Sequence, residues 1–421
     1  MFRRTLDLYR EAFSGLRREV WYLSIVLLIN RSGAMVIPFL TVYLTSKRGF
    51  SLEEAGLIMS SFGVGSLVGS YVGGWITDRF GFYRVQFFTL IGSGLLFAGV
   101  GQLDSFWGLV LGIFALSTVT DAFRPANQAA LAYYSHPRNR ARAYGLLRLA
   151  VNLGFSMGPV IGGIVIATLS YRWLFVINGI SVLMAALAFR LLLPPGRQGE
   201  AEPVDTDEPV HGVSAYRNLR YLAFVGFTML GATAFMQVFN SLPVFLKDEL
   251  LFSEAQIGGL IAINGLLIVV LEMPLVHKVG ELYRPLPVMM IGYLLIAAGY
   301  LFLEGAGLSL LFPLLYIFML TMGEMLSMPF SSTYAAAQAP VSRRGEYMGL
   351  LSIGWAGAFI IAPTLGLRWA GHFGFNSLWG LAAVLSLISA LGMWLLNYQP
   401  SRRVRWRLGK LRRRLTGSKQ P

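Results

Sequence analysis

The chain has 421 residues, of which 55% are hydrophobic and 13% charged, and its mean hydropathy is +0.60. Soluble globular proteins of ordinary composition do not reach these values, so the composition excludes that class and indicates a protein solvated by a bilayer. The net charge of +14 would suggest nucleic acid in a soluble protein, but here the basic residues gather between apolar stretches. We expect a lipid bilayer as partner and no nucleic acid.

Long apolar stretches follow one another along the whole chain. A helix of about 20 apolar residues crosses roughly 30 Å of hydrocarbon, so a chain of this length holds about twelve spans. The predicted class is an all-α polytopic membrane protein. The expected spans are residues 20–46, 54–77, 85–103, 106–133, 142–168, 172–193, 220–246, 255–278, 286–304, 308–337, 346–371 and 375–397.

The first span carries two polar side chains near its middle, Asn30 and Arg31. A charge near the bilayer centre is costly and is kept only where it faces a cavity or a partner. We therefore predict that Asn30 and Arg31 bind substrate, and that the guanidinium favours anionic or zwitterionic compounds.

The turn after the second span reads Gly74-Trp75-Ile76-Thr77-Asp78-Arg79-Phe80-Gly81. Glycines at both ends permit close helix approach and a tight reversal, and Asp78 can accept hydrogen bonds at a helix N-terminus or pair with an arginine. The segment resembles the G-x-x-x-D-R-x-G turn between helices 2 and 3 of the major facilitator superfamily, a family of solute transporters.

That resemblance implies two pseudo-symmetric six-helix bundles and a latch that holds the outward-open state. The residues that match the latch are Gly74, Asp78, Arg79, Gly81 and Arg84. In the family, basic residues follow the second glycine directly, whereas Phe82 and Tyr83 precede Arg84 here. Whether this chain has the family's full relay of charged residues at the turn is therefore left open. The resemblance also places the start of the eleventh span, near Arg344 to Gly349, beside Asp78.

The fourth and fifth spans add further buried polar residues. Asp121 and Arg124 lie one turn apart in the fourth span, where they can pair, and Asn152 lies in the fifth. We predict that Asp121 takes part in proton coupling and that Arg124 and Asn152 bind substrate. A purely structural ion pair between Asp121 and Arg124 is the alternative.

The fifth span also carries glycines at four-residue spacing around a proline, a spacing that lets two helices touch backbone to backbone. The residues are Gly154, Gly158, Pro159, Gly162 and Gly163. The pattern is similar to G-x-x-x-G-P-x-x-G-G, the antiporter motif of drug/proton antiporters in the same superfamily. Packing alone is the alternative interpretation.

A segment rich in proline, glycine and acids follows the sixth span and is typical of a flexible linker. The two halves also share residues at a constant offset of 204, such as Pro125 with Pro329 and Pro159 with Pro363. We expect an N-terminal six-helix bundle (1–193), a cytoplasmic linker (194–219), a C-terminal six-helix bundle (220–398) and a basic cytoplasmic tail (399–421).

The second half carries its own buried polar residues. Gln237 and Asn240 mirror Asn30 and Arg31, and we predict that they bind substrate. Glu272 is assigned to proton coupling, although a position at the cytoplasmic interface near Lys278 is the alternative. Glu324 has no basic residue within two turns on its own helix, and a desolvated carboxylate without a cation can exchange a proton near neutral pH. Glu324 is therefore the first candidate for the proton carrier.

Basic residues crowd the two termini and alternate turns, so the positive-inside rule places both termini in the cytoplasm of a multi-pass inner-membrane protein. The chain contains no cysteine, and its four histidines have no metal-ligand spacing, so we expect no metal and no cofactor besides a proton gradient. We expect a monomer.

These observations favour a proton-coupled transporter that exports amphipathic, drug-like small molecules by alternating access. It is not expected to be an enzyme. One alternative is proton-coupled uptake of peptides or other polar solutes, because the first span faintly resembles the E-x-x-E-R-F helix of oligopeptide transporters, although it lacks the glutamates. A receptor or scaffold that does not transport is the second alternative.

Overall fold

The computed structural model describes residues 15–136, 139–195, 213–340 and 343–398, which form helices without a strand. Twelve helical segments in this part of the chain are long and apolar enough to cross a membrane, which confirms the predicted span count. The first six spans comprise α2 (Arg18–Ser32), α3 (Val36–Val42) and η1 (Tyr43–Lys47), α4 (Leu52–Phe80), α5 (Phe82–Val100), α6 (Phe106–Tyr134), α7 (Arg140–Thr168) and α8 (Tyr171–Leu192). The last six follow a short 3-10 turn, η3 (Ala215–Arg217), and comprise α9 (Leu219–Phe235), α10 (Gln237–Asn240) and α11 (Leu242–Asp248), α12 (Glu254–Leu282), α13 (Pro285–Leu303), α14 (Leu311–Gln338), α15 (Arg344–Phe373) and α16 (Phe375–Tyr398).

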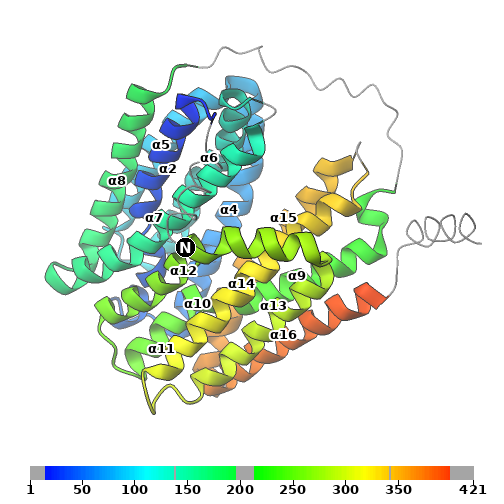
Figure 1. Ribbon diagram of the computed structural model, residues 1–421. Helices are drawn as coiled ribbons and strands as arrows, with labels where there is room; N and C mark the ends of the chain where they lie inside the picture. Colours follow the sequence, from blue (N-terminus) through cyan, green and yellow to red (C-terminus); the bar gives the residue numbers. More distant parts are fainter. Residues whose placement is uncertain (1–14, 137–138, 196–212, 341–342, 399–421) are drawn as a thin grey trace, which may run out of the picture.

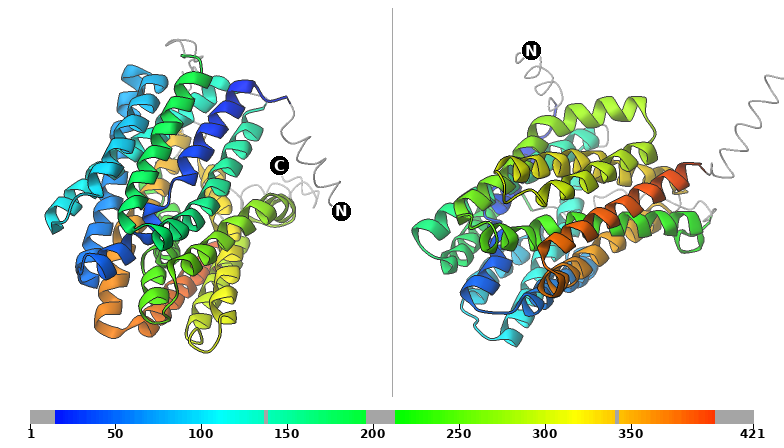
Figure 2. Two further views of the ribbon diagram at one scale, coloured as in Figure 1. Left: turned by 90° about the vertical axis from the view of Figure 1, so that its left-hand side faces the viewer. Right: turned by 90° about the horizontal axis from the view of Figure 1, so that it is seen from below.

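The two sets of six spans form two bundles that lie side by side, as Figures 1 and 2 show from three directions. The predicted fold class is therefore confirmed. We call the end at which α8 finishes and η3 begins the linker end. Most of the predicted linker and the whole basic tail lie outside the described residues, so the predicted domain boundaries stay a prediction.

The first span is divided into α2, α3 and η1, and the seventh into α9, α10 and α11, where the sequence predicted continuous helices. A proline lies shortly after a break in each span: Pro38 follows the first break of the first span, and Pro243 follows the second break of the seventh. Proline has no N–H, and its ring clashes with the carbonyl four residues earlier, so a helix tends to be interrupted just before it. Ala34, four residues before Pro38, lies in the break between α2 and α3.

The second and eighth spans begin in the same way. Ser51 caps α4 and Ser253 caps α12, and each serine hydroxyl accepts a hydrogen bond from the backbone N–H three residues later. Glu54 and Gln256 bond back to the N–H of the capping serine and complete a capping box in both helices. The repeat between the halves therefore extends to the signals that start their helices.

Close packing within the N-terminal bundle depends on glycines of α4 at four-residue spacing. A Cβ on Gly65, Gly69 or Gly73 would collide with atoms of α6. Because lipid tails are as apolar as leucine, helices in a bilayer associate through such small-residue contacts rather than through hydrophobic burial. This packing positions α6, which carries Asp121, against α4.

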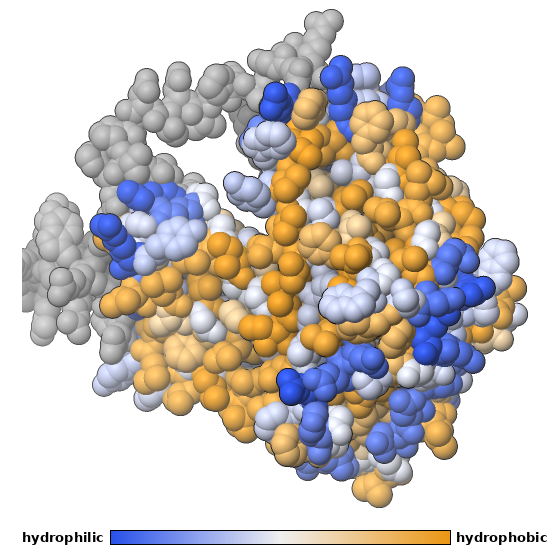
Figure 3. Space-filling model, turned by 180° about the vertical axis from the view of Figure 1, so that it is seen from behind, coloured by the Kyte–Doolittle hydropathy of each residue, from blue (hydrophilic) through white to orange (hydrophobic). Residues whose placement is uncertain are grey.

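The outer surface is mainly apolar. Figure 3 shows hydrophobic side chains over most of the visible face of both bundles. Large apolar side chains such as Tyr71, Trp107, Leu191 and Leu391 are exposed on the described helices. A surface of this kind matches the hydrocarbon region of a bilayer and would aggregate in water.

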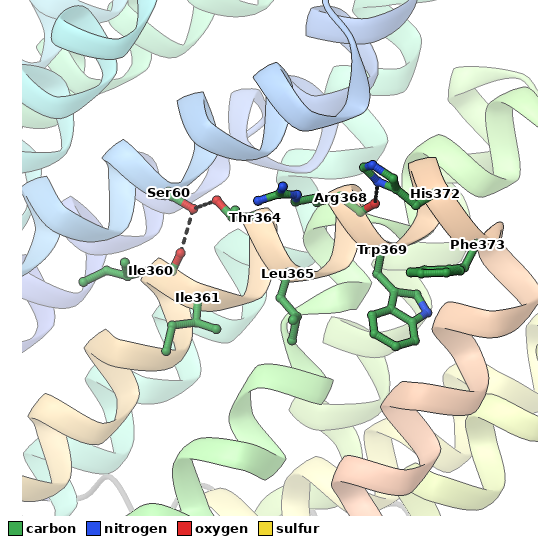
Figure 4. A pocket seen from close by; sticks show the side chains of 9 residues that line it. All are labelled: Ser60, Ile360, Ile361, Thr364, Leu365, Arg368, Trp369, His372 and Phe373. Carbon is green, nitrogen blue, oxygen red and sulfur yellow. Dashed lines mark hydrogen bonds between the residues drawn. The ribbon is translucent and has the colours of Figure 1, made fainter.

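The two bundles meet mainly along two pairs of helices, α4 with α15 and α7 with α12, and α3 makes smaller contacts with α10 and α11. On the first pair, Ser60 Oγ donates to the Ile360 carbonyl (2.6 Å) and lies 2.7 Å from Thr364 Oγ1, in the part of α4 away from the linker end (Figure 4). At the linker end, by contrast, a Cβ on Gly74 of α4 or on Gly349 of α15 would meet open space. Along this pair the seam is therefore closed opposite the linker end and open at the linker end.

Candidate functional site

Glu324 lies near the middle of α14 and is half-buried. Its Oε2 accepts a hydrogen bond from Asn264 Nδ2 on α12 (2.9 Å), and the same nitrogen donates to Thr321 Oγ1 (3.0 Å). Within the described residues, no ion pair involves Glu324. The direct hydrogen-bond partner of this carboxylate is therefore a neutral amide.

Glu272 of α12 is buried and reaches across the seam to the N-terminal bundle. Its Oε1 forms an ion pair with Arg148 of α7, and its Oε2 accepts a hydrogen bond from Asn152 Nδ2 (3.2 Å). In this conformation Glu272 therefore pairs across the seam, and its role in proton coupling stays a prediction. The pairing satisfies a charge that would otherwise be costly at this depth.

Helix α12 connects the two acidic sites. Asn264 and Glu272 lie about two turns apart on this helix, and the charges of Glu272 and Arg148 both act on Glu324. A chain of polar groups thus leads from α14 through α12 to α7, from one bundle into the other.

In the N-terminal bundle, Asp121 and Arg124 form the ion pair that their spacing predicted, with Nε 2.7 Å from Oδ1. Asp121 is buried and its Oδ2 has no hydrogen-bond partner among the described residues, whereas half of the Arg124 side chain is exposed. Arg31 lies with its guanidinium 5.5 Å from the ring centroid of Phe155, and its buried Nε also has no described partner. Asp121 and Arg31 therefore each keep an unused hydrogen-bonding atom.

Gln237 and Asn240, predicted to bind substrate, are instead buried within the C-terminal bundle. The Gln237 amide donates to the carbonyls of Thr233 (3.2 Å) and Ala362 (3.0 Å) and accepts from Ser241 Oγ (2.7 Å). Asn240 Nδ2 donates to the Met236 carbonyl (2.8 Å). These bonds tie together the broken seventh span and α15, because the breaks expose backbone carbonyls that need donors. In this conformation the two side chains therefore bond within the C-terminal bundle, and their role in substrate binding stays a prediction. Asn30, by contrast, remains half-buried at the end of α2.

The glycines of the fifth span pack α7 against the first span. A Cβ on Gly154 would lie 2.5 Å from Arg31 Cβ, and one on Gly158 would lie 2.9 Å from the Ala34 carbonyl oxygen. Gly162 meets Met35 and Phe39 in the same way, while Gly163 faces the start of α12 in the other bundle. The predicted backbone-to-backbone packing is present, and it sets the position of Arg31.

The turn between α4 and α5 requires glycine at one position. Gly81 has φ +82°, in the left-handed region that favours glycine, and it ends α4 before α5 begins at Phe82. The close approach expected of Gly74 is made by its neighbour Gly73, whose Cβ would collide with Ala122 of α6. Close packing at Gly74 is therefore absent in this conformation and stays a prediction about another one.

Asp78 lies in the last turn of α4, with its side chain exposed, and it has no hydrogen bond or ion pair with any described residue. Arg79 lies over the Trp75 ring, 5.6 Å from its centroid, and Arg84 is exposed. The expected contact between Asp78 and the start of α15 is not present in this conformation, because the bundles are apart there. The latch itself stays a prediction about another conformation.

Opposite the linker end, polar groups that the sequence analysis missed cross the seam. The Tyr171 hydroxyl of α8 donates to Glu254 Oε1 of α12 (2.9 Å), and Lys247 of α11 forms an ion pair with the same carboxylate oxygen (2.8 Å). Ser46 Oγ donates to Asp248 Oδ1 (3.4 Å). These contacts hold the two bundles together at this end.

A groove of about 630 Å³ runs beside the α4–α15 seam (Figure 4). Ser60 and the last turns of α15 line it, including Leu365, Arg368, Trp369 and His372. None of the predicted site residues is among its lining, so the groove and the polar chain of α14, α12 and α7 are separate features. In the described part of the chain, no group of three or more His, Asp or Glu side chains could hold a metal ion.

Asn264 and Arg148 complete the site, but the sequence analysis assigned no role to either. The signal for Asn264 was its position two turns before Glu272 on one helix, where side chains share a face. Arg148 precedes Asn152 by one turn in the same way. No sequence signal placed α12 against α14, so the partnership of Asn264 with Glu324 could not be inferred.

Comparison with known proteins identifies relatives over most of the chain. The sequence profile of the Major Facilitator Superfamily matches residues 23–340 and 239–419. The Na(+), Li(+), K(+)/H(+) antiporter of Planococcus maritimus is 24% identical, over 89% of this chain and 95% of that protein. Multidrug resistance protein MdtH of Yersinia enterocolitica is 26% identical, over 86% of this chain and 89% of the relative. The crystal structure of a POT family transporter in complex with 5-aminolevulinic acid has a TM-score of 0.74 at 16% identity and covers 91% of this chain and 96% of that one.

Proposed function

The chain belongs to the Major Facilitator Superfamily, and we propose that it is a proton-coupled secondary transporter that exports amphipathic, drug-like compounds by alternating access. One observation carries the proton coupling. Glu324 lies within a span, half-buried, with a neutral amide as its hydrogen-bond partner. A carboxyl group in this setting can bind and release a proton, whereas Glu272 and Asp121 are each tied to an arginine.

Alternating access is supported by the one-sided seam. Tyr171 with Glu254, and Ser60 with Ile360, join the bundles opposite the linker end. With both termini and the linker in the cytoplasm, as the positive-inside rule favours, this conformation faces the cytoplasm. The counterpart, open on the other side, requires these contacts to break and the α4–α15 pair to close near Asp78.

Export is supported by the chain's relatives and by the fifth-span motif. The antiporter and the multidrug resistance protein are both similar over most of their length. The antiporter-like glycines of α7 lie against the first span, next to Arg31. In this proposal the proton gradient is the energy source. One protein molecule contains both bundles and the polar groups of α14, α12 and α7.

Uptake of polar solutes is the second candidate, and one observation favours it. Arg31 and Arg124 face a single carboxylate, Asp121, so the N-terminal part of the site carries a surplus of positive charge. Such a surplus attracts anionic or zwitterionic compounds rather than cationic drugs. The experiment therefore has to determine both the direction of transport and the charge of the compounds that are transported.

The test is transport into proteoliposomes with and without an imposed pH gradient, using a panel of cationic, neutral, anionic and zwitterionic compounds. Glu324→Gln should abolish gradient-driven accumulation and preserve counterflow, because the amide keeps the shape of the side chain and cannot be protonated. The matched control is Glu304→Gln at the exposed end of α13, which should accumulate substrate like the wild type. Full uphill transport by Glu324→Gln would reject the assignment of the proton site.

A further inference from the structure

The orientation of the Asn264 amide is fixed by the hydroxyl of Thr321. Thr321 Oγ1 donates its proton to the Ile317 carbonyl (2.6 Å), so toward Asn264 it can act only as an acceptor. The Asn264 atom that faces it must therefore be the NH2 group. One N–H goes to Thr321, and the second is directed at Glu324 Oε2 (2.9 Å).

This arrangement favours one protonation state of Glu324. An amide N–H bonds more strongly to a carboxylate oxygen than to the carbonyl oxygen of a neutral acid. If Oε2 carried the proton, Asn264 would have to rotate its amide to present Oδ1 and would lose its bond to Thr321. The hydrogen-bond chain from Ile317 to Glu324 therefore stabilises the deprotonated carboxyl group more than the protonated one.

Asn264 lies on the helix of the C-terminal bundle that contacts α7. It is buried on α12, and a Cβ on the adjacent Gly265 would collide with Ser156 of α7. The charged groups that act on Glu324 are Glu272 of the same helix and Arg148 of α7. The Asn264 amide itself bonds to α14, within the C-terminal bundle.

We propose that Asn264 is a positioning residue: pinned by Thr321, it directs an N–H at Glu324 Oε2 and stabilises the carboxylate form of Glu324 in this conformation. Proton uptake adds one proton to the Glu324 carboxylate and changes no other covalent bond. This inference rests on the proposed function, because it takes Glu324 as the proton carrier.

The experiment follows the carboxyl group itself. Infrared difference spectra of the full chain in proteoliposomes, recorded over a pH series, give the midpoint of the carboxyl band that Glu324→Gln removes. Asn264→Ala should move this midpoint upward by about one to two pH units, the size expected for one lost hydrogen bond to a charged group. Thr321→Val should move it in the same direction by less, because the amide remains but is no longer pinned.

The matched control is Asn127→Ala in α6. Asn127 is as buried as Asn264, and its side chain bonds to the neutral Gln86 amide (3.1 Å), so its loss should leave the midpoint in place. A wild-type midpoint in Asn264→Ala and Thr321→Val would overturn this inference and leave the proton site intact. If the wild type has no titrating band that Glu324→Gln removes, the proton site and this inference both fail. Thr321→Val keeps the test available if Asn264→Ala does not fold.

Discussion

Arg31 and Asp121 illustrate how single residues define what the N-terminal bundle can bind. Each keeps a buried hydrogen-bonding atom with no described partner, and such atoms cost free energy unless a ligand, water or a second conformation satisfies them. Arg31 is held beside Phe155 by the close approach of Gly154. The guanidinium is therefore positioned before a substrate arrives.

Replacing Arg31 should change affinity according to the charge of the substrate. Arg31→Ala should weaken binding of anionic compounds about 10- to 100-fold, since a hydrogen bond to a charged group contributes about 1.5–3 kcal/mol. Arg31→Lys should lose part of the affinity for anionic compounds, because an ammonium cannot form the bidentate contact of a guanidinium. The measurement is the affinity of purified protein for each compound. The control is Arg172→Ala, which removes an exposed arginine at the start of α8, opposite the linker end. Unchanged affinity across anionic, zwitterionic and neutral compounds would make Arg31 a structural residue.

The residues that the sequence could identify are those whose partners lie on the same helix. Asp121 with Arg124 follows from a three-residue spacing and was predicted. Glu272 with Arg148, and Glu324 with Asn264, join different helices, and helix neighbours cannot be read from one chain without its packing. The bond from Gln237 to the Ala362 carbonyl could not be predicted for the same reason, because Ala362 is far along the chain.

At the scale of helices, glycine spacing predicted contact but could not identify the contacting helix. Gly154 and Gly158 place α7 against the first span, whereas Gly65 and Gly69 place α4 against α6. The breaks in the first and seventh spans were missed although Pro38 and Pro243 were visible. Proline also lies inside the unbroken helices α6, α7, α12, α14 and α15, so its presence alone does not predict a break.

The contact between α7 and the first span should be sensitive to one methyl group. Gly154→Ala places a Cβ 2.5 Å from Arg31 Cβ and should destabilise the protein by about 1–3 kcal/mol, the usual cost of overpacking. Gly226→Ala in α9 is the matched control, because its Cβ would meet open space and alanine is the better helix former. Thermal unfolding in detergent measures both. If the two variants unfold at the same temperature, the contact tolerates a side chain and the motif has another purpose.

At the scale of the whole molecule, the sequence predicted two bundles but not which end of the seam is closed. The contact expected between Asp78 and the start of α15 is absent here because the bundles are apart at the linker end. In the proposed alternating-access cycle two conformations use the same sequence, so one chain cannot indicate which is more populated. The structure identifies contacts of one state, and the latch motif points to contacts of the other.

Asp78→Asn should favour the conformation described here. If the carboxylate stabilises the state closed at the linker end, its loss should change the ratio of the two states roughly tenfold for each 1.4 kcal/mol removed. The chain has no cysteine, so spin labels can be attached at Phe80→Cys and Gly349→Cys, two exposed positions at the linker end. The distance between the two labels reports whether α4 and α15 are apart or closed there. An identical distance distribution with and without Asp78, in conditions where the wild type populates both states, would rule out the latch.

Tyr171→Phe should shift the same equilibrium the other way. The Tyr171 hydroxyl bonds across the seam to the Glu254 carboxylate (2.9 Å), and both side chains are largely buried. A hydrogen bond to a charged group contributes about 1.5–3 kcal/mol, so its loss should favour closure at the linker end by roughly tenfold or more. Lys247 stays paired with Glu254 in this variant, so the carboxylate is not left as an uncompensated charge.

Spin labels at positions 80 and 349 measure this shift, and Tyr171→Phe should give more of the short distance between them. The control is Tyr398→Phe, which changes an exposed tyrosine at the end of α16 and should give the wild-type distribution. If Tyr171→Phe and Asp78→Asn move the distance distribution in the same direction, the contacts at the two ends do not stabilise opposite conformations. The conformation described here would then not be one of two alternating-access states.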